Sequence, residues 1–513
     1  MDKPQLSVKE PLFAPKKVVG FWQILRRTVL AEKLYNRVGI TFFILLAAVL
    51  GFGIAKFGAT FGVLFIVTAV ALPAVYAIVV YPKFGIIVVL IMAYLLFLLM
   101  RIGVSGPIGV IMDVMQALLM LGVLIAQKRE HNWEILKGPI STMIVIWIVY
   151  NLLEIANPSA ESRVAWLYTI RSLAIVMLSY FVFLYNIRSV KFIRLIFKIW
   201  LAMSLFAALY AVKQEYIGFS DAEEAYLHSD PGIASLLLID GHWRKFSIFS
   251  DPVSFAYNMS MSAIFCISLI SGNLKLWKKI ILGGLTVLFL VSMLYSGTRG
   301  ANVLVPAAVF LFAILKYNRK VLIFAGIAFA FLVILINVPT GDPNLSRFQT
   351  AFRPNQDASY KLRKFNQKRI QPYILSHPIG FGLGSTGTWG KRFGNNSYVA
   401  QFQPDSGYVR VSVELGWVGL LIFCMLMFTV LKTGINNYYQ IKDPELKTYC
   451  LAILLIIFAY NIANFPQEAL VQFPSNVYFS LDMALLTVLF RLDKEKQENE
   501  AKPLLTLNTD NNG

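Results

Sequence analysis

Long apolar runs, separated by short polar segments, make up most of this chain. Several windows hold roughly 18 or more apolar residues, enough for a helix to cross the hydrocarbon core of a bilayer. We therefore expect an all-α, polytopic integral membrane protein with about 14 transmembrane helices. The predicted spans, in order, are Val38–Ala55, Phe57–Tyr81, Phe84–Met100, Ile108–Ala126, Pro139–Leu153, Ala165–Tyr185, Leu195–Val212, Pro252–Ile270, Ile280–Tyr295, Ala301–Leu315, Val321–Val338, Tyr408–Leu431, Tyr449–Ile462 and Val477–Phe490.

Lysine and arginine concentrate in alternate short loops between these spans. Such loops face the cytoplasm, so both termini are expected there. The first 37 residues lack a short apolar core followed by a cleavage site, so no cleaved signal peptide is expected; Phe21–Leu30 could form a helix on the membrane surface. The predicted parts are a cytoplasmic basic tail at 1–37, eleven helices at 38–338 with an outer loop at 213–251, a large extracytoplasmic loop at 339–407, three helices at 408–490 and a cytoplasmic tail at 491–513.

Composition agrees with a membrane protein, because 57% of the residues are hydrophobic, 15% are charged and the mean hydropathy is +0.63. Soluble domains contain about a quarter charged residues. The net charge of +19 does not indicate nucleic-acid binding, since lysine and arginine collect in cytoplasmic loops of membrane proteins. Cys266, Cys424 and Cys450 all lie in apolar runs, where we interpret them as small hydrophobic residues. No disulfide framework or metal-ligand spacing is visible.

The large loop between the eleventh and twelfth predicted spans is strongly basic. Its lysines and arginines far outnumber its acidic residues, which are Asp342, Asp357 and Asp405. Long loops are translocated regardless of charge, so the basicity needs another cause. A basic cap above a membrane suits an anionic ligand whose tail lies in the lipid.

Part of this loop, Tyr360–Ile370, is predicted to be a helix. Lys361, Lys364 and Lys368 share one face at steps of three and four, and attraction to anionic headgroups accounts for them. Arg363 lies on another face, and we favour Arg363 and Arg369 as ligands of a bound anion.

Two arginines outside the loop are further candidates. Arg299 sits in a glycine-flanked turn, where the backbone can approach a ligand and a guanidinium can bind phosphate through two nitrogens. It could instead reach towards lipid headgroups. Arg171 lies about two turns inside the sixth span, where a charge usually faces a cavity or a partner. The alternative for Arg171 is a structural pair with Asp113 or Glu154.

The remaining candidates flank the twelfth predicted span. His377 opens a glycine-rich segment that lacks the Lys-Ser/Thr ending of a P-loop, and is a loop contact or a base. Asp405 is either a helix cap or a general base for a hydroxyl. Tyr408 follows one turn later, and Arg410 and Glu414, four residues apart, can pair.

Four motifs in this order resemble the O-antigen ligase and O-antigen polymerase family of bacterial envelope glycosyltransferases. They are FSDPVSFA at Phe249–Ala256, SGTRGA at Ser296–Ala301, HPIGFGLG at His377–Gly384, and DSGY at Asp405–Tyr408 running on to ELGWVG at Glu414–Gly419. The resemblance covers about Leu195–Leu431. It implies an all-helical fold in the bacterial inner membrane, an external active site, and a donor glycan on undecaprenyl pyrophosphate. It implies no cofactor and no metal.

The same resemblance assigns roles to residues. The arginine of the family's glycine turn corresponds to Arg299, and an arginine of the large loop corresponds to Arg363. Ligases typically carry a His-Asn pair where this chain has Asp405-Ser406. An acid there resembles the polymerase branch, which includes exopolysaccharide polymerases, and makes Asp405 the base. Arg171, Arg369 and Arg410 are added as candidate pyrophosphate ligands.

We therefore expect an inverting polysaccharide polymerase that transfers glycan from the lipid pyrophosphate to an acceptor sugar hydroxyl. Its expected partners are the lipid-linked oligosaccharide, an acceptor glycan or glycolipid, and the bilayer; other polysaccharide-assembly proteins are candidates, and nucleic acid is not. One alternative is an O-antigen ligase that transfers glycan to lipid A core. Another is a flippase of lipid-linked oligosaccharides, although such transporters commonly show internal repeats and this chain shows none.

Overall fold

The computed structural model describes residues 37–58, 61, 65, 73–103, 108–239, 241–353, 358–394 and 397–509. The chain divides into two compact units, Met1–Tyr76 and Ala77–Gly513. In the first unit, helix α2 (Arg37–Phe57) matches the first predicted span. The predicted surface helix at Phe21–Leu30, nearly all of the N-terminal tail and most of the second predicted span lie outside the described residues.

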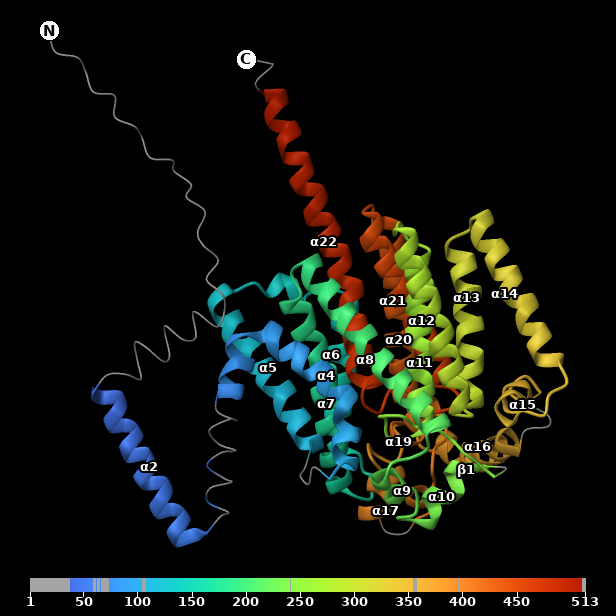
Figure 1. Ribbon diagram of the computed structural model, residues 1–513, viewed down its shortest axis with the longest axis horizontal. Helices are drawn as coiled ribbons and strands as arrows, with labels where there is room; N and C mark the ends of the chain where they lie inside the picture. The colour runs from blue at the N-terminus through green and yellow to red at the C-terminus, as the bar shows by residue number, and fades with distance from the viewer. Residues whose placement is uncertain are drawn as a thin grey trace. The chain divides into compact units, whose positions relative to one another are not determined.

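The second unit is built from long helices joined by short connections (Figure 1). These helices are α4 (Pro82–Arg101), α5 (Ile108–Glu130), α6 (Pro139–Leu153), α7 (Arg163–Asn186), α8 (Val190–Tyr216), α11 (Pro252–Ile270), α12 (Leu276–Tyr295), α13 (Leu304–Leu315), α14 (Arg319–Asn337), α20 (Gly416–Gln440), α21 (Pro444–Ala463) and α22 (Ser475–Thr509). Within the described part of the chain, 11 helices are long and apolar enough to cross a membrane, and two apolar helices are shorter. Together they match every predicted span except the second. The predicted all-α, polytopic membrane fold is thus confirmed.

Polar side chains begin several of these helices by accepting backbone N–H groups of the first turn. Ser162 accepts the N–H of Ala165 at the start of α7, and Ser189 does the same for Phe192 in α8. Asp251 accepts two N–H groups of α11. Such caps stabilise helix starts, so the boundaries are largely encoded in the local sequence.

One prediction about the helices was wrong. The twelfth span was expected to run without interruption from Tyr408 to Leu431, but the chain forms a short helix, α19 (Gly407–Glu414), and then α20. The break lies at Gly416, whose φ of +67° is one that side chains rarely adopt. A Cβ on Gly416 would overlap the carbonyl oxygen of Pro378, so contact with a distant segment imposes the break.

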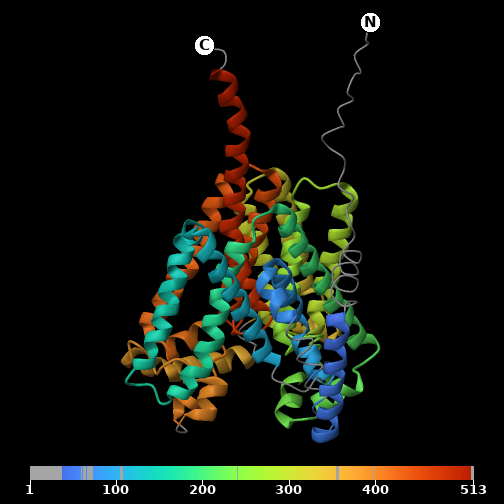
Figure 2. The same ribbon diagram turned by 90° about the vertical axis from the view of Figure 1, so that its left-hand side faces the viewer.

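The short elements of the second unit lie mainly in the connections at one end of the long helices, which we call the site end (Figures 1 and 2). They are η3 (Glu154–Ala156), α9 (Asp221–Leu227), α10 (Pro231–Leu237), β1 (Leu238–Ile239), β2 (His242–Trp243), η4 (Arg299–Val303), α15 (Pro343–Thr350), α16 (Ala358–Ser376), α17 (Gly387–Phe393), α18 (Tyr398–Gln401) and α19. Strands β1 and β2 pair antiparallel. At the opposite end lie η2 (Trp133–Leu136) and the long extension of α22.

Aromatic side chains tie four of the long helices together in the core. Trp200 of α8 stacks on Phe265 of α11, with ring centroids 5.1 Å apart. Tyr478 of α22 lies 5.1 Å from Trp200, and Tyr94 of α4 meets Tyr478 edge-on at 5.3 Å. This packing joins the start of α22 and the second half of α11 to α4 and α8.

Candidate functional site

The glycine turn that carries Arg299 is bonded to the start of α11. Thr298 donates its hydroxyl to the carbonyl oxygen of Pro252 at 3.2 Å, and its N–H to the hydroxyl of Ser296 at 3.1 Å. Gly297 has a φ of +58°, so the turn needs glycine at this position. The first two sequence motifs therefore form one structural unit, and Arg299 begins η4 directly after it.

Two arginines that the sequence analysis did not select lie at the same turn. Arg244 donates from Nε to the carbonyl oxygen of Ser296 at 2.8 Å and from Nη2 to the Thr298 hydroxyl at 3.0 Å. Nε of Arg347 lies 3.1 Å from where a Cβ on Gly297 would be. Burial, together with the charges of Arg347 and Arg299, lowers the pKa of Arg244 to about 10, against the opposing effect of Asp251. Three guanidinium groups thus concentrate positive charge at this turn, which favours binding of an anion.

Asp405 lies half-buried just before α19, and it is not the cap of that helix. Ser406 has this role, because its hydroxyl accepts the N–H of Val409 at 3.5 Å. Burial raises the pKa of the Asp405 carboxyl, and the nearby positive charge of Arg363 opposes this shift. Arg363 comes from the half-buried face of α16, which the sequence predicted as a helix. The two candidates therefore lie within electrostatic range of each other.

Tyr257 of α11 connects this carboxyl region to the arginine turn. Its hydroxyl lies 3.1 Å from where a Cβ on Gly300 would be. It is also within electrostatic range of Arg363 and of Asp251. The arginine turn and the Arg363–Asp405 pair thus flank the same part of α11.

Arg410 lies between two acidic side chains. Nε donates to Glu414 at 3.1 Å, and Nη1 donates to Glu468 at 2.6 Å. Burial alone would lower the pKa of Arg410, but the two carboxylates together raise it above its ordinary value. Burial also raises the pKa of Glu468, which Arg410 offsets only in part. The sequence left open whether Arg410 pairs with Glu414, and the structure contains this pair.

Glu414 in turn holds the glycine-rich motif. Its carboxylate accepts the N–H of Gly384 at 3.0 Å and the hydroxyl of Thr386 at 2.6 Å. The N–H of Phe381 donates to the carbonyl oxygen of Val413 at 3.0 Å. The third motif therefore binds the end of α19 and fixes the position of the segment that begins with Asp405.

Tyr408 and His377 make local contacts. The Tyr408 hydroxyl donates to the backbone and side-chain oxygens of Asn461, each at 3.2 Å. Burial raises the pKa of Tyr408 to about 12. Nδ1 of His377 lies 2.9 Å from the hydroxyl of Ser376, and its ring packs on Phe381 at 4.1 Å. These contacts agree with the interpretation of His377 as a loop residue.

The last two candidate arginines have other partners. Nε of Arg171 lies 3.1 Å from the carboxylate of Asp113 on α5. This is the structural pair that the sequence left open, and it accounts for Arg171 without an anionic ligand. The guanidinium of Arg369 lies 5.2 Å from the ring centroid of Tyr398, in a cation–π contact on the exposed side of α16.

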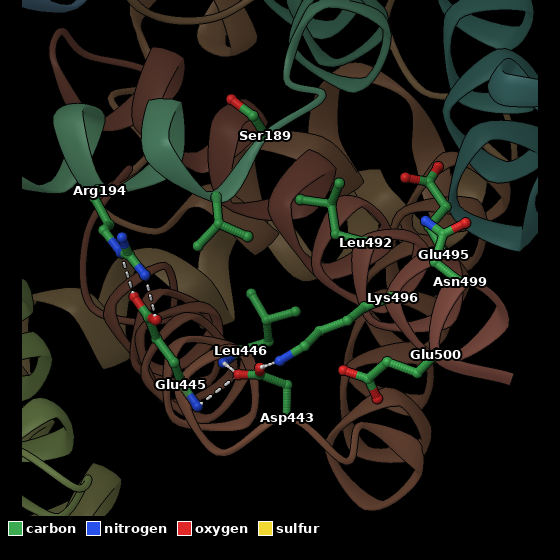
Figure 3. Close-up of a pocket in the computed structure, with 11 residues that line it drawn as sticks. Ser189, Arg194, Asp443, Glu445, Leu446, Leu492, Glu495, Lys496, Asn499 and Glu500 are labelled. Carbon is green, nitrogen blue, oxygen red and sulfur yellow. Dashed lines mark hydrogen bonds and ion pairs between the residues drawn. The ribbon is translucent and has the colours of Figure 1, made fainter. Parts of the chain in front are cut away.

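A cavity of about 570 Å³ opens at the opposite end, between the starts of α8 and α21 and the extension of α22 (Figure 3). Arg194 binds Glu445 through two nitrogens, each at 2.6 Å, and Lys496 binds Asp443 at 2.6 Å. None of the candidate residues lines this cavity. Its central charges are already paired, so we place the candidate site at the other end.

Comparison with known proteins identifies relatives. Residues 284–424 match the family model described as O-antigen ligase. A curated protein of Salmonella muenchen described as an O-antigen polymerase is 27% identical over 256 residues, which cover 47% of this chain and 59% of the relative. The alignment thus spans less than two thirds of the relative. The family match contains the Arg299 turn, the large loop and Asp405. Together these matches confirm the predicted resemblance, and they relate this multi-pass membrane protein to the O-antigen ligase and polymerase family.

Proposed function

We propose that this protein is an envelope polysaccharide polymerase. It transfers glycan from an undecaprenyl-pyrophosphate-linked donor to an acceptor sugar hydroxyl, with inversion at the anomeric carbon and without a metal. The observation that carries the proposal is the half-buried carboxyl of Asp405, which lies within electrostatic range of Arg363 in the part of the chain that matches the family. The description of the Salmonella relative as an O-antigen polymerase supports the same reaction.

Asp405 accepts the proton of the acceptor hydroxyl in this mechanism. The hydroxyl oxygen attacks the anomeric carbon, and the bond from that carbon to the pyrophosphate oxygen breaks. Burial raises the pKa of Asp405, which makes the carboxylate a stronger base than an exposed aspartate. A positioned base of this kind typically contributes about 10²–10⁴-fold to the rate.

The arginines stabilise the leaving group. Negative charge develops on the pyrophosphate as the glycosidic bond breaks, and preorganised guanidinium groups stabilise such charge without reorganising. Arg299 and Arg363 have this role in the proposal. Arg244 positions the Arg299 turn through its bonds to Ser296 and Thr298.

The membrane side of the site follows from charge in the short loops. Among the short loops, basic residues concentrate at the end opposite to the site: Lys128, Arg129, Lys137, Lys275, Lys278, Arg319, Lys320 and Lys442. The positive-inside rule assigns that end to the cytoplasm, together with the extension of α22, and the basic residues of the N-terminal tail assign that tail to the cytoplasm as well. The site then faces outwards from the bacterial inner membrane, where a lipid-linked donor is available and a nucleotide sugar is not needed.

An O-antigen ligase is the second candidate, because the matching family model is described by that name. A ligase would use the same donor and join the glycan to lipid A core. The two functions differ in acceptor and in product.

The test uses purified protein and a lipid-pyrophosphate-linked repeat unit from the same cell. A polymerase produces a ladder of glycan lengths, which Asp405→Asn and Arg299→Ala abolish. A single product that requires added lipid A core identifies a ligase. If no donor is consumed with any acceptor, the glycosyltransferase proposal is wrong, and transbilayer movement of the donor becomes the next measurement.

A further inference from the structure

Helix α16 has an inward face that packs on the candidate site. The side chains that are at least partly buried follow steps of three and four along one side of the helix: Arg363, Asn366, Gln367, Ile370 and Ile374. Ile370 is 1% exposed and belongs to a small apolar cluster with Val413 of α19. Arg363 therefore points to the same side as the contacts that bind α16 to α19.

The outward face of α16, defined as Lys361, Leu362, Lys364, Phe365 and Lys368, combines charge with exposed apolar surface. All three lysines are exposed, and Leu362 and Phe365 are 58% and 55% exposed. Residues 358–376 contain no Asp or Glu to balance the charge. Large apolar side chains next to lysines are typical of a helix that lies in a membrane interface.

The position of α16 places this face near the bilayer surface. Helix α15 packs against α12 and α14, and α16 packs against α19 and α20. Figure 1 shows α15 and α16 at the site end, with α15 next to the end of α14. Most of the described surface of α14 is apolar and exposed, as expected for lipid contact. Only residues 338–342 separate the lipid-facing helix α14 from α15, and α16 begins at Ala358.

We propose that the outward face of α16 docks on anionic phospholipid headgroups at the membrane surface. The lysine ammonium groups bind headgroup phosphates, while Leu362 and Phe365 insert between the headgroups. Lysines close to an anionic surface attract it strongly, and the attraction falls off within a Debye length. The positive charge of the outward face favours anionic over zwitterionic lipid. Its exposed apolar residues favour insertion between headgroups over contact with water alone.

Docking on lipid would also hold the inward face in place. Arg363 belongs to the inward face and its neighbour Lys364 to the outward face, so a helix that binds headgroups keeps Arg363 within electrostatic range of Asp405. Glycan transfer should therefore depend on anionic lipid. This consequence rests on the proposed function, whereas the docking itself does not.

The first experiment measures docking without any enzymatic activity. An environment-sensitive fluorophore is attached at Leu362→Cys in the full chain, after Cys266, Cys424 and Cys450 are replaced by serine or alanine. The protein is reconstituted in phosphatidylcholine vesicles with or without phosphatidylglycerol. We expect a blue shift and protection from an aqueous quencher in the anionic vesicles. Lys361→Gln/Lys364→Gln/Lys368→Gln should weaken the preference for anionic lipid by roughly tenfold or more.

A matched control removes the same number of charges at the opposite end, through Lys275→Gln/Lys278→Gln/Lys279→Gln. This variant should retain the fluorescence response. An identical response in neutral and anionic vesicles would overturn the proposal, as would a response that the α16 substitutions leave unchanged. If the fluorophore is protected from the quencher in native membranes but not in pure lipid vesicles, the face binds a protein partner and the lipid-docking proposal is wrong.

The second experiment separates the two proposals. Asp405→Asn should lose glycan transfer and retain the lipid response of the fluorophore. The α16 lysine variant should retain transfer but lose severalfold of its stimulation by phosphatidylglycerol. If transfer is absent in every lipid while the fluorophore responds, docking holds and the proposed function fails. If transfer occurs and neither readout depends on anionic lipid, docking fails and the function holds.

Discussion

Replacing Arg410 by alanine removes the guanidinium that lies between Glu414 and Glu468. Glu414 is 2% exposed, and it keeps its bonds to the Gly384 N–H and the Thr386 hydroxyl. Glu468 loses the 2.6 Å bond to Arg410, and its side chain is only 24% exposed to solvent that could compensate the charge. Removing one partner of a buried ion pair typically costs about 3–5 kcal/mol, because the other charge is left uncompensated. We expect a loss near the lower end, about 3 kcal/mol, because Glu414 keeps two partners.

The loss should depend on pH with a defined sign. Burial already raises the pKa of Glu468, and without Arg410 this pKa rises further. A carboxyl with a raised pKa destabilises the folded state when it is ionised, so the loss is largest at high pH. It shrinks as the pH falls through the pKa of Glu468, where the carboxyl takes up a proton. Adding Glu468→Gln to Arg410→Ala should likewise restore part of the stability at neutral pH.

The assay measures reversible unfolding of the purified protein in mixed micelles. The free energy of unfolding is obtained from denaturant titrations at several pH values. Arg129→Ala serves as the control, since Arg129 is an exposed arginine at the opposite end, and it should change stability by less than about 0.5 kcal/mol. A loss below about 1 kcal/mol for Arg410→Ala would refute the reasoning. So would a loss that is the same at every pH and is unaffected by Glu468→Gln.

Four further predictions concern the site and the residues that support it. Gly416→Ala should lower the free energy of unfolding by several kcal/mol or prevent folding, because a Cβ would overlap the Pro378 carbonyl. Gly283→Ala is the control, since a Cβ there meets open space, and it should not have this effect. Equal melting temperatures for the two variants would contradict the prediction. Asp405→Asn should abolish transfer yet leave the melting temperature unchanged or slightly higher, because burial disfavours the charged carboxyl. For the same reason, transfer by the wild type should be lost as the pH falls through a pKa above the ordinary aspartate value of about 4, while stability does not fall there; a pH–rate profile checks this sign. Arg244→Lys keeps a positive charge but cannot bind Ser296 and Thr298 together, so it should reduce stability by about 1–2 kcal/mol and weaken donor binding; unchanged values for both would show that the turn does not need Arg244.

The helices were largely predictable because their signals are local. Helix α11 was predicted as Pro252–Ile270 and has these bounds in the structure. Asp251 caps its first turn and Pro252 suits the first helical position, so the chain near the boundary encodes it. The break before α20 was missed for the opposite reason. Its cause is the carbonyl of Pro378, which lies far from Gly416 in sequence.

The site residues divide in the same way. Arg299 and Asp405 were selected through their motifs, and Arg363 through its helix face and its correspondence to a loop arginine of the family. Their positions around α11 agree with a common site. Arg244 and Arg347 were not selected, because a single arginine without a motif or helical spacing carries no signal in the sequence. Arg410 could be seen to match Glu414 at a spacing of four, but its partner Glu468 lies on a different segment.

The sequence by itself determined that this chain is a helical membrane protein, and approximately where most of its long described helices lie. Those properties depend on the length of apolar runs and on caps within a few residues of each boundary. Only the tertiary structure decided which charges meet. Arg171 with Asp113, Arg410 with Glu468 and Arg244 with the Ser296 turn join segments that are distant in sequence. Such pairings arise from the packing of whole helices, which local periodicity does not specify.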